Sequence, residues 1–534
     1  MRVGDARLYD WSGQFARLGA LEVGPDFAIA RGTVRVVTTT PTRNKKATSN
    51  RLRGALAVRR PWTPSVPSQP RLTLLERLLN FFTDIRPGEG VTGVLLFANV
   101  FLILCAYYFI KPLRDSWIAV SGVEGLSSME VKAYSSFGQS LLLAAVASGF
   151  ARFSLRMPRH QLITRSTLVC MSNLVVFWLL QPGFLLANLP YAGVVFYLWV
   201  GMFGVFVVAQ FWTMAADLYA GDRGARLLPL IAIGATAGAA FGSFLTSALV
   251  ASGVFDSGSL LLFANVPLGL SILLTRRADA RGPLGHGAED MPPARPVASA
   301  SAPKPSTSGA LATVFGNRYL LGVAVVVMLA NWVNTNGENL LFRVIQEELT
   351  QQALAEGITG AAETVAFLRS GTALFYGTFF FWVNLAALLT QSFLVSRLLR
   401  FGGFGATMLM LPTIALVSYT TMALLPMLAV VRVLKIAENA TDYSINNTAR
   451  QVLWLPTTSE QKFKAKPAID SLFVRLGDGF AALTVLVGVH ALDLSAQSFF
   501  MVNVALVVVW LGVSVGIVRA YSRMTAAQSA GVSL

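Results

Sequence analysis

The stretch AQSFFMVNVALVVVWLGVSVGIV, residues 496–518, contains no charged residue from end to end. A helix that crosses the hydrocarbon core of a bilayer needs about 20 consecutive, mainly apolar residues. The whole chain of 534 residues has a similar character, because 54% of it is hydrophobic and only 13% is charged. Soluble domains carry about 25% charged residues. The sequence therefore predicts an all-α integral membrane protein.

Stretches of this length and composition recur along the chain, and we expect twelve transmembrane helices in two six-helix halves, residues 94–277 and 313–523. The expected spans are 94–112, 134–151, 162–181, 190–216, 227–250, 258–275, 319–337, 371–396, 403–423, 425–448, 468–490 and 496–518. Two six-helix halves joined by a long central loop look like the major facilitator architecture. In such transporters the substrate binds near the bilayer midplane, between the halves.

The segments outside the two halves have a different composition. Residues 1–71 are rich in Gly, Pro and Arg without a helical period, which indicates a disordered basic tail. Residues 72–85, LTLLERLLNFFTDI, have apolar positions at helical spacing and are expected to form an amphipathic helix on the membrane surface. Residues 278–312 are rich in Pro, Ala and Ser and are expected to be a cytoplasmic linker, and 524–534 a short C-terminal tail.

The net charge of +16 does not indicate nucleic-acid binding. Residues 1–71 hold thirteen Arg or Lys and four Asp or Glu, so this tail alone contributes +9. Alternate loops between the spans also carry basic residues, among them Arg276, Arg277, Arg397, Arg400, Lys464, Arg519 and Arg523. The positive-inside rule places these loops, and with them both termini, in the cytoplasm. We expect membrane lipid, and no nucleic acid, as the surroundings of this chain.

Ionisable and polar residues inside the predicted spans or just beyond their ends are the candidate functional residues. A charged side chain at the bilayer centre costs at least about 2.5–3.5 kcal/mol on insertion scales, so it marks a site by default. They occur at the ends of spans one and four and in spans seven and ten, which line the central cavity in the major facilitator architecture. The candidates are Lys111, Arg114, Asp115, Asp217, Glu338, Lys435, Glu438 and Asn446.

Structural explanations compete with a site for several of these residues. Lys435 and Glu438 are three residues apart, and Lys111 and Asp115 four, so each pair could simply neutralise itself on one helix face. Asp217 lies near a span end and could reach the membrane surface. The repeat of Gly234, Gly238 and Gly242 predicts a close helix-packing face. No metal-ligand spacing, cofactor motif, P-loop or catalytic constellation is evident, so we expect neither enzyme chemistry nor a cofactor.

Three stretches give the chain a family resemblance. AYYFIKPLRDSW (106–117), FWTMAADLYAGDRGARLLPLIAIGA (211–235) and DYSINNTARQVLWLPTTSEQKFKAKPAID (442–470) are similar to motifs of the ATP/ADP translocases of plastids and intracellular bacteria. The resemblance implies substrate-related charges at Arg114, Asp217, Glu338 and Arg450. The family has Lys at the first and last of these positions and Glu at the second, and Gln451 replaces a family Glu. Arg presents a planar fork that binds phosphate oxygens bidentately.

The resemblance implies an ATP/ADP antiporter of the bacterial inner membrane that works by alternating access. Arg114 and Arg450 would hold the phosphates, with Lys111, Lys435 and Asn446 also in the binding site. Asp217, Glu338, Asp115 and Glu438 would pair with these cations when the site is empty. Two alternatives remain open at this point. One is a proton-driven transporter of another organic anion, through Asp217 or Glu338, and the other is a membrane scaffold without transport activity.

Overall fold

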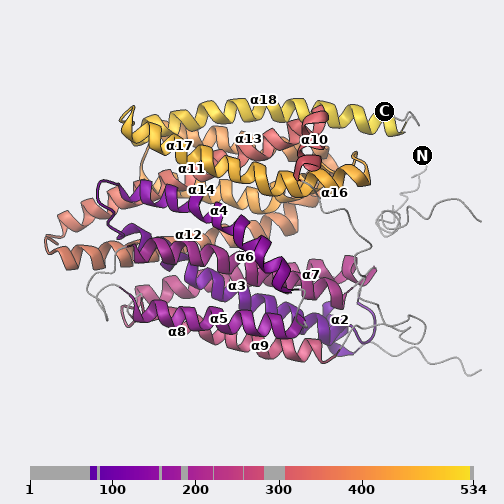
Figure 1. Ribbon diagram of the computed structural model, residues 1–534, viewed down its shortest axis with the longest axis horizontal. Helices are drawn as coiled ribbons and strands as arrows, with labels where there is room; N and C mark the ends of the chain where they lie inside the picture. The colour runs from indigo at the N-terminus through magenta and orange to yellow at the C-terminus, as the bar shows by residue number, and fades with distance from the viewer. Residues whose placement is uncertain are drawn as a thin grey trace, which may run out of the picture. The chain divides into compact units, whose positions relative to one another are not determined.

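The fold consists of helices, and no β-strand occurs among residues 73–80, 85–154, 159–181, 191–219, 222–255, 258–281 and 307–529, which the computed structural model describes (Figure 1). The first half contains α2 (Leu74–Leu79), α3 (Gly90–Ala119), α4 (Ser128–Ser154), α5 (Arg159–Leu179), α6 (Ala192–Leu218), α7 (Asp222–Ala251), α8 (Leu260–Phe263) and α9 (Asn265–Asp279). The second contains α10 (Thr307–Gly316), α11 (Arg318–Ala355), α12 (Ala361–Leu389), η1 (Thr390–Leu394), α13 (Val395–Leu424), α14 (Leu428–Thr441), η2 (Asp442–Asn446), α15 (Asn447–Val452), α16 (Ser459–Ala468), η3 (Ile469–Phe473), α17 (Val474–His490) and α18 (Ala496–Ser529), where η marks a π-helical turn.

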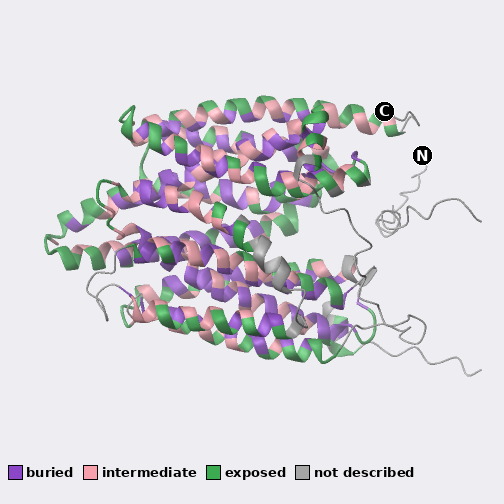
Figure 2. Cartoon of the chain, in the orientation of Figure 1, coloured by how far each residue is buried: buried purple, intermediate pink, exposed green. Residues whose placement is uncertain are grey.

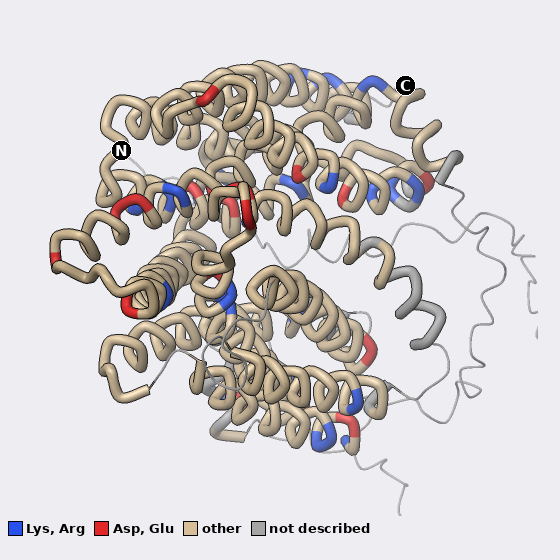
Figure 3. The backbone as a smooth tube through the Cα atoms, turned by 60° about the vertical axis from the view of Figure 1, so that its left-hand side comes forward, with Lys and Arg blue, Asp and Glu red and all other residues tan. Residues whose placement is uncertain are grey.

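Ten of these helical segments are long and apolar enough to cross a membrane, so the chain is an integral membrane protein. Each of the twelve expected spans overlaps helical residues of the described part of the chain, but two of them do not meet this standard of length and hydropathy. The two that fall outside the ten are α4, which carries Lys132 and Gln139, and the broken rod α14–η2–α15, which carries Lys435 and Glu438. Figure 3 shows long uncharged stretches along the helices, interrupted where the few charged residues gather.

Each half has its own apolar core. One cluster of buried side chains is drawn mainly from α3 to α9 and includes Leu96, Phe196 and Leu268. The other is drawn mainly from α10 to α18 and includes Phe342 and Phe500. Large apolar side chains are also exposed on outer helix faces, as at Val508 and Val509 of α18, and Figure 2 shows exposed positions recurring along this helix. Exposed apolar faces of this extent fit contact with lipid.

The glycine repeat of α7 packs directly on α3. A Cβ added at Gly234, Gly238 or Gly242 would lie 2.8, 2.2 and 2.2 Å from the carbonyl oxygens of Phe97, Phe101 and Cys105. Three successive turns of the two helices therefore touch backbone to backbone. The predicted helix-packing face is confirmed, and it holds α3, which carries Lys111 and Arg114, against α7.

Several helix ends differ from the expected ones. We expected span seven to end at residue 337, but α11 continues to Ala355 because Leu340, Leu341 and Ile345 extend its buried face. Likewise, α3 continues past residue 112 to Ala119, and α4 begins at Ser128 rather than 134. In each case polar residues that lie inside the bundle look in the sequence like the end of a span. The helix α10 begins before residue 312, within the expected linker, and α18 continues beyond residue 523. The tail expected at 1–71 lies outside the described residues.

The short helix α2 is anchored by Glu76, which is 3% exposed. The Thr73 amide donates to Glu76 Oε2 at 2.8 Å, and the Glu76 amide donates to Thr73 Oγ1 at 3.3 Å, which is a capping box. The Gly88 amide donates to Glu76 Oε1 at 2.7 Å, in a turn that glycine favours because its φ is +91°. These hydrogen bonds join α2 to the start of α3. They also hold the pKa of Glu76 below its ordinary value of 4.5, the bond from Thr73 most strongly and against an opposing effect of burial.

We expect Glu76→Gln to loosen α2 from α3, because hydrogen bonds to a charged acceptor contribute about 1.5–3 kcal/mol and those to a neutral one less. Amide hydrogen exchange in residues 73–80 and 85–90 should become at least about five-fold faster at neutral pH. A carboxylate with a lowered pKa stabilises the fold above its unfolded pKa, and that stabilisation is lost as pH falls through the folded pKa. Wild-type exchange should therefore approach the variant's in acid, below the ordinary glutamate range. The exposed Glu124→Gln is the matched control and should change neither segment.

Candidate functional site

A polar cavity of about 210 Å³ lies where the two halves meet. It receives side chains from α3, α4 and α6 of the first half and from α11, α12 and η2 of the second. We expected spans one, four, seven and ten to line it, and the second and eighth spans, α4 and α12, contribute as well. The lining residues are Tyr107, Lys111, Arg114, Lys132, Ser136, Gln139, Tyr197, Asn334, Thr335, Glu338, Asn339, Phe380 and Tyr443.

On the first-half side, Asp115 is clamped by two cations. Arg114 Nη2 lies 3.0 Å from Asp115 Oδ2, and Lys132 Nζ lies 3.5 Å from Oδ1. Lys132 also donates to the Tyr376 hydroxyl at 3.0 Å and to the Glu338 carbonyl oxygen at 3.4 Å, so it joins α4 to the second half. The pairing of Asp115 with Lys111, considered from the sequence as a structural alternative, is not found. Arg114 and Lys132, rather than Lys111, neutralise this carboxylate.

On the second-half side, Glu338 and Glu438 share Lys435, which is fully buried. Lys435 Nζ lies 3.1 Å from Glu438 Oε2 and 3.8 Å from Glu338 Oε1. The pairing of Lys435 with Glu438 on one helix face, considered from the sequence, is therefore present, but it is part of a wider network. Asn439 donates to Glu338 Oε1 at 2.7 Å, and the Tyr419 hydroxyl donates to Glu438 Oε1 at 3.0 Å.

Lys111 has a different environment from the other cations. Its Nζ lies 3.9 Å from the ring centre of Phe380 and 5.0 Å from that of Tyr108, which are cation–π distances. Arg114 likewise lies over the Tyr197 ring, at 4.4 Å. Among the described residues, Lys111 has no carboxylate within ion-pair distance. An aromatic ring compensates a buried cation less than a carboxylate does, so Lys111 is the cation most available to an anionic ligand.

The cavity therefore presents an excess of positive charge. Lys111, Arg114 and Lys132 line it, with Asp115 and Glu338 as the neighbouring carboxylates, while Lys435 and Glu438 cancel each other behind them. In the described part of the chain, Arg114 Nε and Asn339 Nδ2 are buried and donate no hydrogen bond. An anion with several oxygen acceptors would satisfy these donors and the uncancelled charge. No group of three His, Cys, Asp or Glu residues in the same part of the chain could hold a metal ion.

Three of the sequence candidates lie elsewhere. Asp217 is an exposed residue in the last turn of α6 and does not line the cavity. Arg450 pairs with Asp470 at 3.0 Å, with more than a third of each side chain exposed. It lies seven residues beyond Tyr443, about 10 Å further along the rod. Asn446 is buried in η2, where it donates to Asp442 Oδ1 at 2.6 Å, and it does not line the cavity either.

Sequence reasoning missed Lys132, which the structure places at the centre of the network. The sequence predicts that span two begins at residue 134, which leaves Lys132 in the preceding loop. A signal was nevertheless present, because Lys132, Ser136 and Gln139 recur at intervals of four and three, as polar residues on one helix face do. All three line the cavity.

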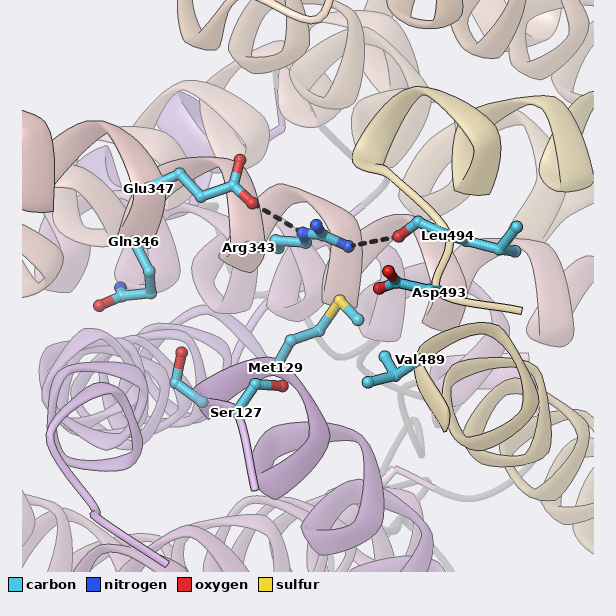
Figure 4. A pocket seen from close by; sticks show the side chains of 9 residues that line it. Ser127, Met129, Arg343, Gln346, Glu347, Val489, Asp493 and Leu494 are labelled. Atoms are coloured by element: carbon cyan, nitrogen blue, oxygen red, sulfur yellow. Dashed lines mark hydrogen bonds and ion pairs between the residues drawn. The ribbon is translucent and has the colours of Figure 1, made fainter. Parts of the chain in front are cut away.

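A second polar pocket, of about 270 Å³, lies between the start of α4, α11 and the α17–α18 turn (Figure 4). In it Arg343 Nε donates to Glu347 at 2.7 Å and Nη1 donates to the Leu494 carbonyl oxygen at 3.1 Å. Just beyond, His490 of α17 lies 2.7 Å from Glu130 of α4. Arg343 is already paired with Glu347, and the other charged residue in the lining, Asp493, is acidic, so this pocket offers no available cation to an anionic ligand.

The comparison with known families bears directly on this site. Residues 293–521 match the family model described as TLC ATP/ADP transporter. The predicted family resemblance is confirmed over this region. The matched residues include Glu338, Asn339, Lys435, Glu438 and Tyr443, that is, the second-half side of the cavity and its network. The chain has a major-facilitator-type fold, as the solved structures below show.

Solved transporters share the fold at low sequence identity. A mutant of the nucleoside transporter NupG is 15% identical and superposes with a TM-score of 0.53 over 80% of this chain and 99% of its own. A POT family transporter in complex with 5-aminolevulinic acid is 14% identical, with a TM-score of 0.52 over 81% of this chain and 96% of its own. A bacterial homologue of Spinster is 12% identical, with a TM-score of 0.50, covering 83% and 99%. No curated protein matches the chain.

Proposed function

We propose that this protein is a secondary transporter that exchanges ATP for ADP by alternating access. One observation carries the proposal. Lys111, Arg114 and Lys132 of the first half converge on one cavity that has a surplus of positive charge. The other side of this cavity is formed by the part of the chain that is similar to the ATP/ADP transporters. Phosphate oxygens are the acceptors that such clustered cations bind best. Tyr107, Phe380 and Tyr443 supply aromatic surface beside them for a planar base.

The ion pairs around the cavity suggest how exchange would be enforced. A cavity of about 210 Å³ is smaller than the roughly 300–1,000 Å³ of ligand pockets in general, so it must widen to admit a nucleotide. The incoming phosphates would draw Arg114 and Lys132 away from Asp115, and a carboxylate left unpaired in the bundle costs several kcal/mol. Without a substrate the pairs would re-form and Lys132 would again join α4 to Tyr376 of the second half, which would hinder reorientation of the unloaded carrier. Exchange of ATP⁴⁻ for ADP³⁻ moves one net charge, about 2.3 kcal/mol per 100 mV of potential.

The orientation in the membrane is part of the same proposal. The basic loops identified in the sequence favour both termini in the cytoplasm, and the resemblance favours a bacterial inner membrane. One observation also favours a second candidate, a proton-coupled transporter of another organic anion. Glu338 lines the cavity and is a partly exposed carboxylate beside Lys435, so it could take up a proton during a cycle.

The test uses the purified full-length protein in liposomes. We expect uptake of labelled ATP to require ADP or ATP inside the vesicle and to persist when an uncoupler collapses the proton gradient. We also expect ATP and ADP, but not AMP or sugar phosphates, to raise the melting temperature of the protein in detergent. Uptake that ignores internal nucleotide and stops with the uncoupler would support the proton-coupled candidate. A protein that none of these ligands stabilises, and that exchanges no nucleotide, would contradict the proposal.

A further inference from the structure

The carboxylate of Asp478 in α17 lies outside the cavity but joins the two halves beside it. Asp478 is 7% exposed. Its Oδ2 accepts from Ser140 Oγ of α4 at 2.5 Å and from Arg475 at 3.0 Å. Its Oδ1 accepts from Asn331 at 2.6 Å and from Thr335 at 3.0 Å, both in α11. Four donors from three helices thus converge on one buried side chain.

The backbone around Asp478 is built for close contact on both sides. A Cβ added at Gly477 would lie 2.7 Å from the carbonyl oxygen of Met328 in α11, and one at Gly479 would lie 3.0 Å from the ring of Phe137 in α4. The sequence Gly-Asp-Gly therefore lets α17 fit between the two helices with its carboxylate at the junction. A surface carboxylate that merely neutralises Arg475 would not need glycine on either side.

The contacts of Asp478 with α4 and α11 lie directly beside residues that line the cavity. Ser136 and Gln139 of α4 line the cavity, and Ser140 follows directly, while Thr335 of α11 both lines the cavity and donates to Asp478. The Glu130–His490 pair joins the same two helices about ten residues earlier on α4, that is, about 15 Å away. Two contacts therefore join α4 to α17, Ser140–Asp478 and Glu130–His490, one on each side of the stretch of α4 that faces the cavity.

The contacts of Asp478 favour a structural role. Both of its carboxylate oxygens are occupied by hydrogen-bond donors from α4, α11 and α17. Hydrogen bonds to a charged acceptor contribute more than neutral ones, and a buried carboxylate that loses its donors is strongly destabilised. The contact between α4 and α17 is therefore strong. The hydrogen bond from Ser140 to Asp478 breaks when α4 moves away from α17.

We propose that Asp478 is a positioning residue that holds the cavity shut on its Ser140 side, and that it must release Ser140 once in every transport cycle. Through Thr335 it also links this contact to the wall of the cavity, so a substrate that displaces α11 weakens it. This inference rests on the proposed exchange function. It adds a residue that neither the motifs nor the cavity lining identify.

The first test cross-links α4 to α17 without altering Asp478. Phe137→Cys and Gly479→Cys are combined in a background in which Cys105 and Cys170 are alanine, and the pair is bridged by a short thiol-specific cross-linker. We expect ATP/ADP exchange in liposomes to fall at least ten-fold on cross-linking and to recover when the bridge is reduced. The control pair, Phe404→Cys with Tyr521→Cys, lies within the second half, where the two native rings are 4.0 Å apart. Bridging it should leave exchange unchanged.

The second test separates positioning from folding. We expect Asp478→Asn to lower the maximal exchange rate at least ten-fold while KM for ATP and the stabilisation by ATP change less than three-fold, and Asp478→Glu to recover part of the rate. Exchange that continues unchanged through the α4–α17 cross-link, or an Asp478→Asn variant with the wild-type maximal rate, would overturn the role of Asp478 alone. Wild-type protein that neither binds nor exchanges ATP would overturn the proposed function itself.

Discussion

Replacing Lys132 by alanine should lower ATP/ADP exchange at least about 100-fold, which corresponds to about 2.7 kcal/mol. Lys132 is 3% exposed, lines the cavity, and contacts Asp115, Tyr376 and the Glu338 carbonyl oxygen. The variant removes one of three cations from the binding region. It also leaves the buried Asp115 with Arg114 as its one ion-pair partner among the described residues. A change that breaks a buried pair costs about 3–5 kcal/mol.

Arg450 is the matched comparison. The family resemblance implies that it binds substrate, but it does not line the cavity. Arg450 pairs with Asp470 where both side chains are more than a third exposed, and exposed pairs contribute about 0–1 kcal/mol. We expect Arg450→Ala to lower exchange less than about five-fold under the same conditions. Initial rates of labelled ATP uptake into ADP-loaded liposomes measure both variants, at equal amounts of monodisperse protein. If Arg450→Ala lowers exchange more than Lys132→Ala does, the substrate binds closer to η2 and α15 than the cavity lies.

Tyr376→Phe separates charge from packing at Lys132. This change removes one hydrogen bond to the ammonium group but leaves the ion pair with Asp115 in place. A single net hydrogen bond contributes about 0.5–1.5 kcal/mol, so exchange should fall by no more than about ten-fold. If Tyr376→Phe and Lys132→Ala reduce exchange equally, the role of Lys132 is to hold α4 against α12 rather than to supply charge.

The architecture could be predicted from the sequence because it depends on properties that are local to each span. Apolar stretches of sufficient length specify the helices, and the recurrence of glycine every four residues predicts a close helix-packing face on α7, although it does not identify α3 as the partner. Where spans end was harder to predict. Polar residues such as Asn334 and Glu338 look like the exit from a bilayer, yet they line a cavity, and α11 continues beyond them for several turns.

The site could be predicted only in part, because its pairs join residues far apart in the chain. Lys132 contacts Tyr376 across 244 positions, and Asn439 contacts Glu338 across 101. Spacing along one helix correctly suggested Lys435 with Glu438, whereas it suggested Lys111 for Asp115 although Arg114 and Lys132 take that place. When three cations lie near one carboxylate, the tertiary structure determines which of them form ion pairs with it. The spacing of residues along the sequence does not carry this information.

The second large effect is expected at the contact between α3 and α7. Replacing Gly238 by leucine should reduce the yield of monodisperse protein at least about ten-fold, and Gly238→Ala should cost about 3 kcal/mol of stability, at the upper end of the range for overpacked sites. A Cβ at this position would lie 2.2 Å from the Phe101 carbonyl oxygen and 2.8 Å from its Cα. Both are backbone atoms, so no side-chain rotation can relieve the overlap and α3 must move away from α7.

Gly512 of α18 provides the control, since a Cβ added there meets no atom within 4 Å. Alanine at an open helix position is favoured over glycine by up to about 1 kcal/mol, so Gly512→Ala should leave yield and melting temperature unchanged or slightly higher. Size-exclusion chromatography of the detergent-solubilised variants measures the yield of monodisperse protein, and thermal unfolding measures the melting temperature. Because α3 carries Lys111 and Arg114 as well as its contact with α7, any folded Gly238→Ala protein should also bind ATP more weakly than wild type. A Gly238→Ala protein as stable as Gly512→Ala, with unchanged ATP binding, would mean that α3 and α7 are further apart than this backbone contact allows.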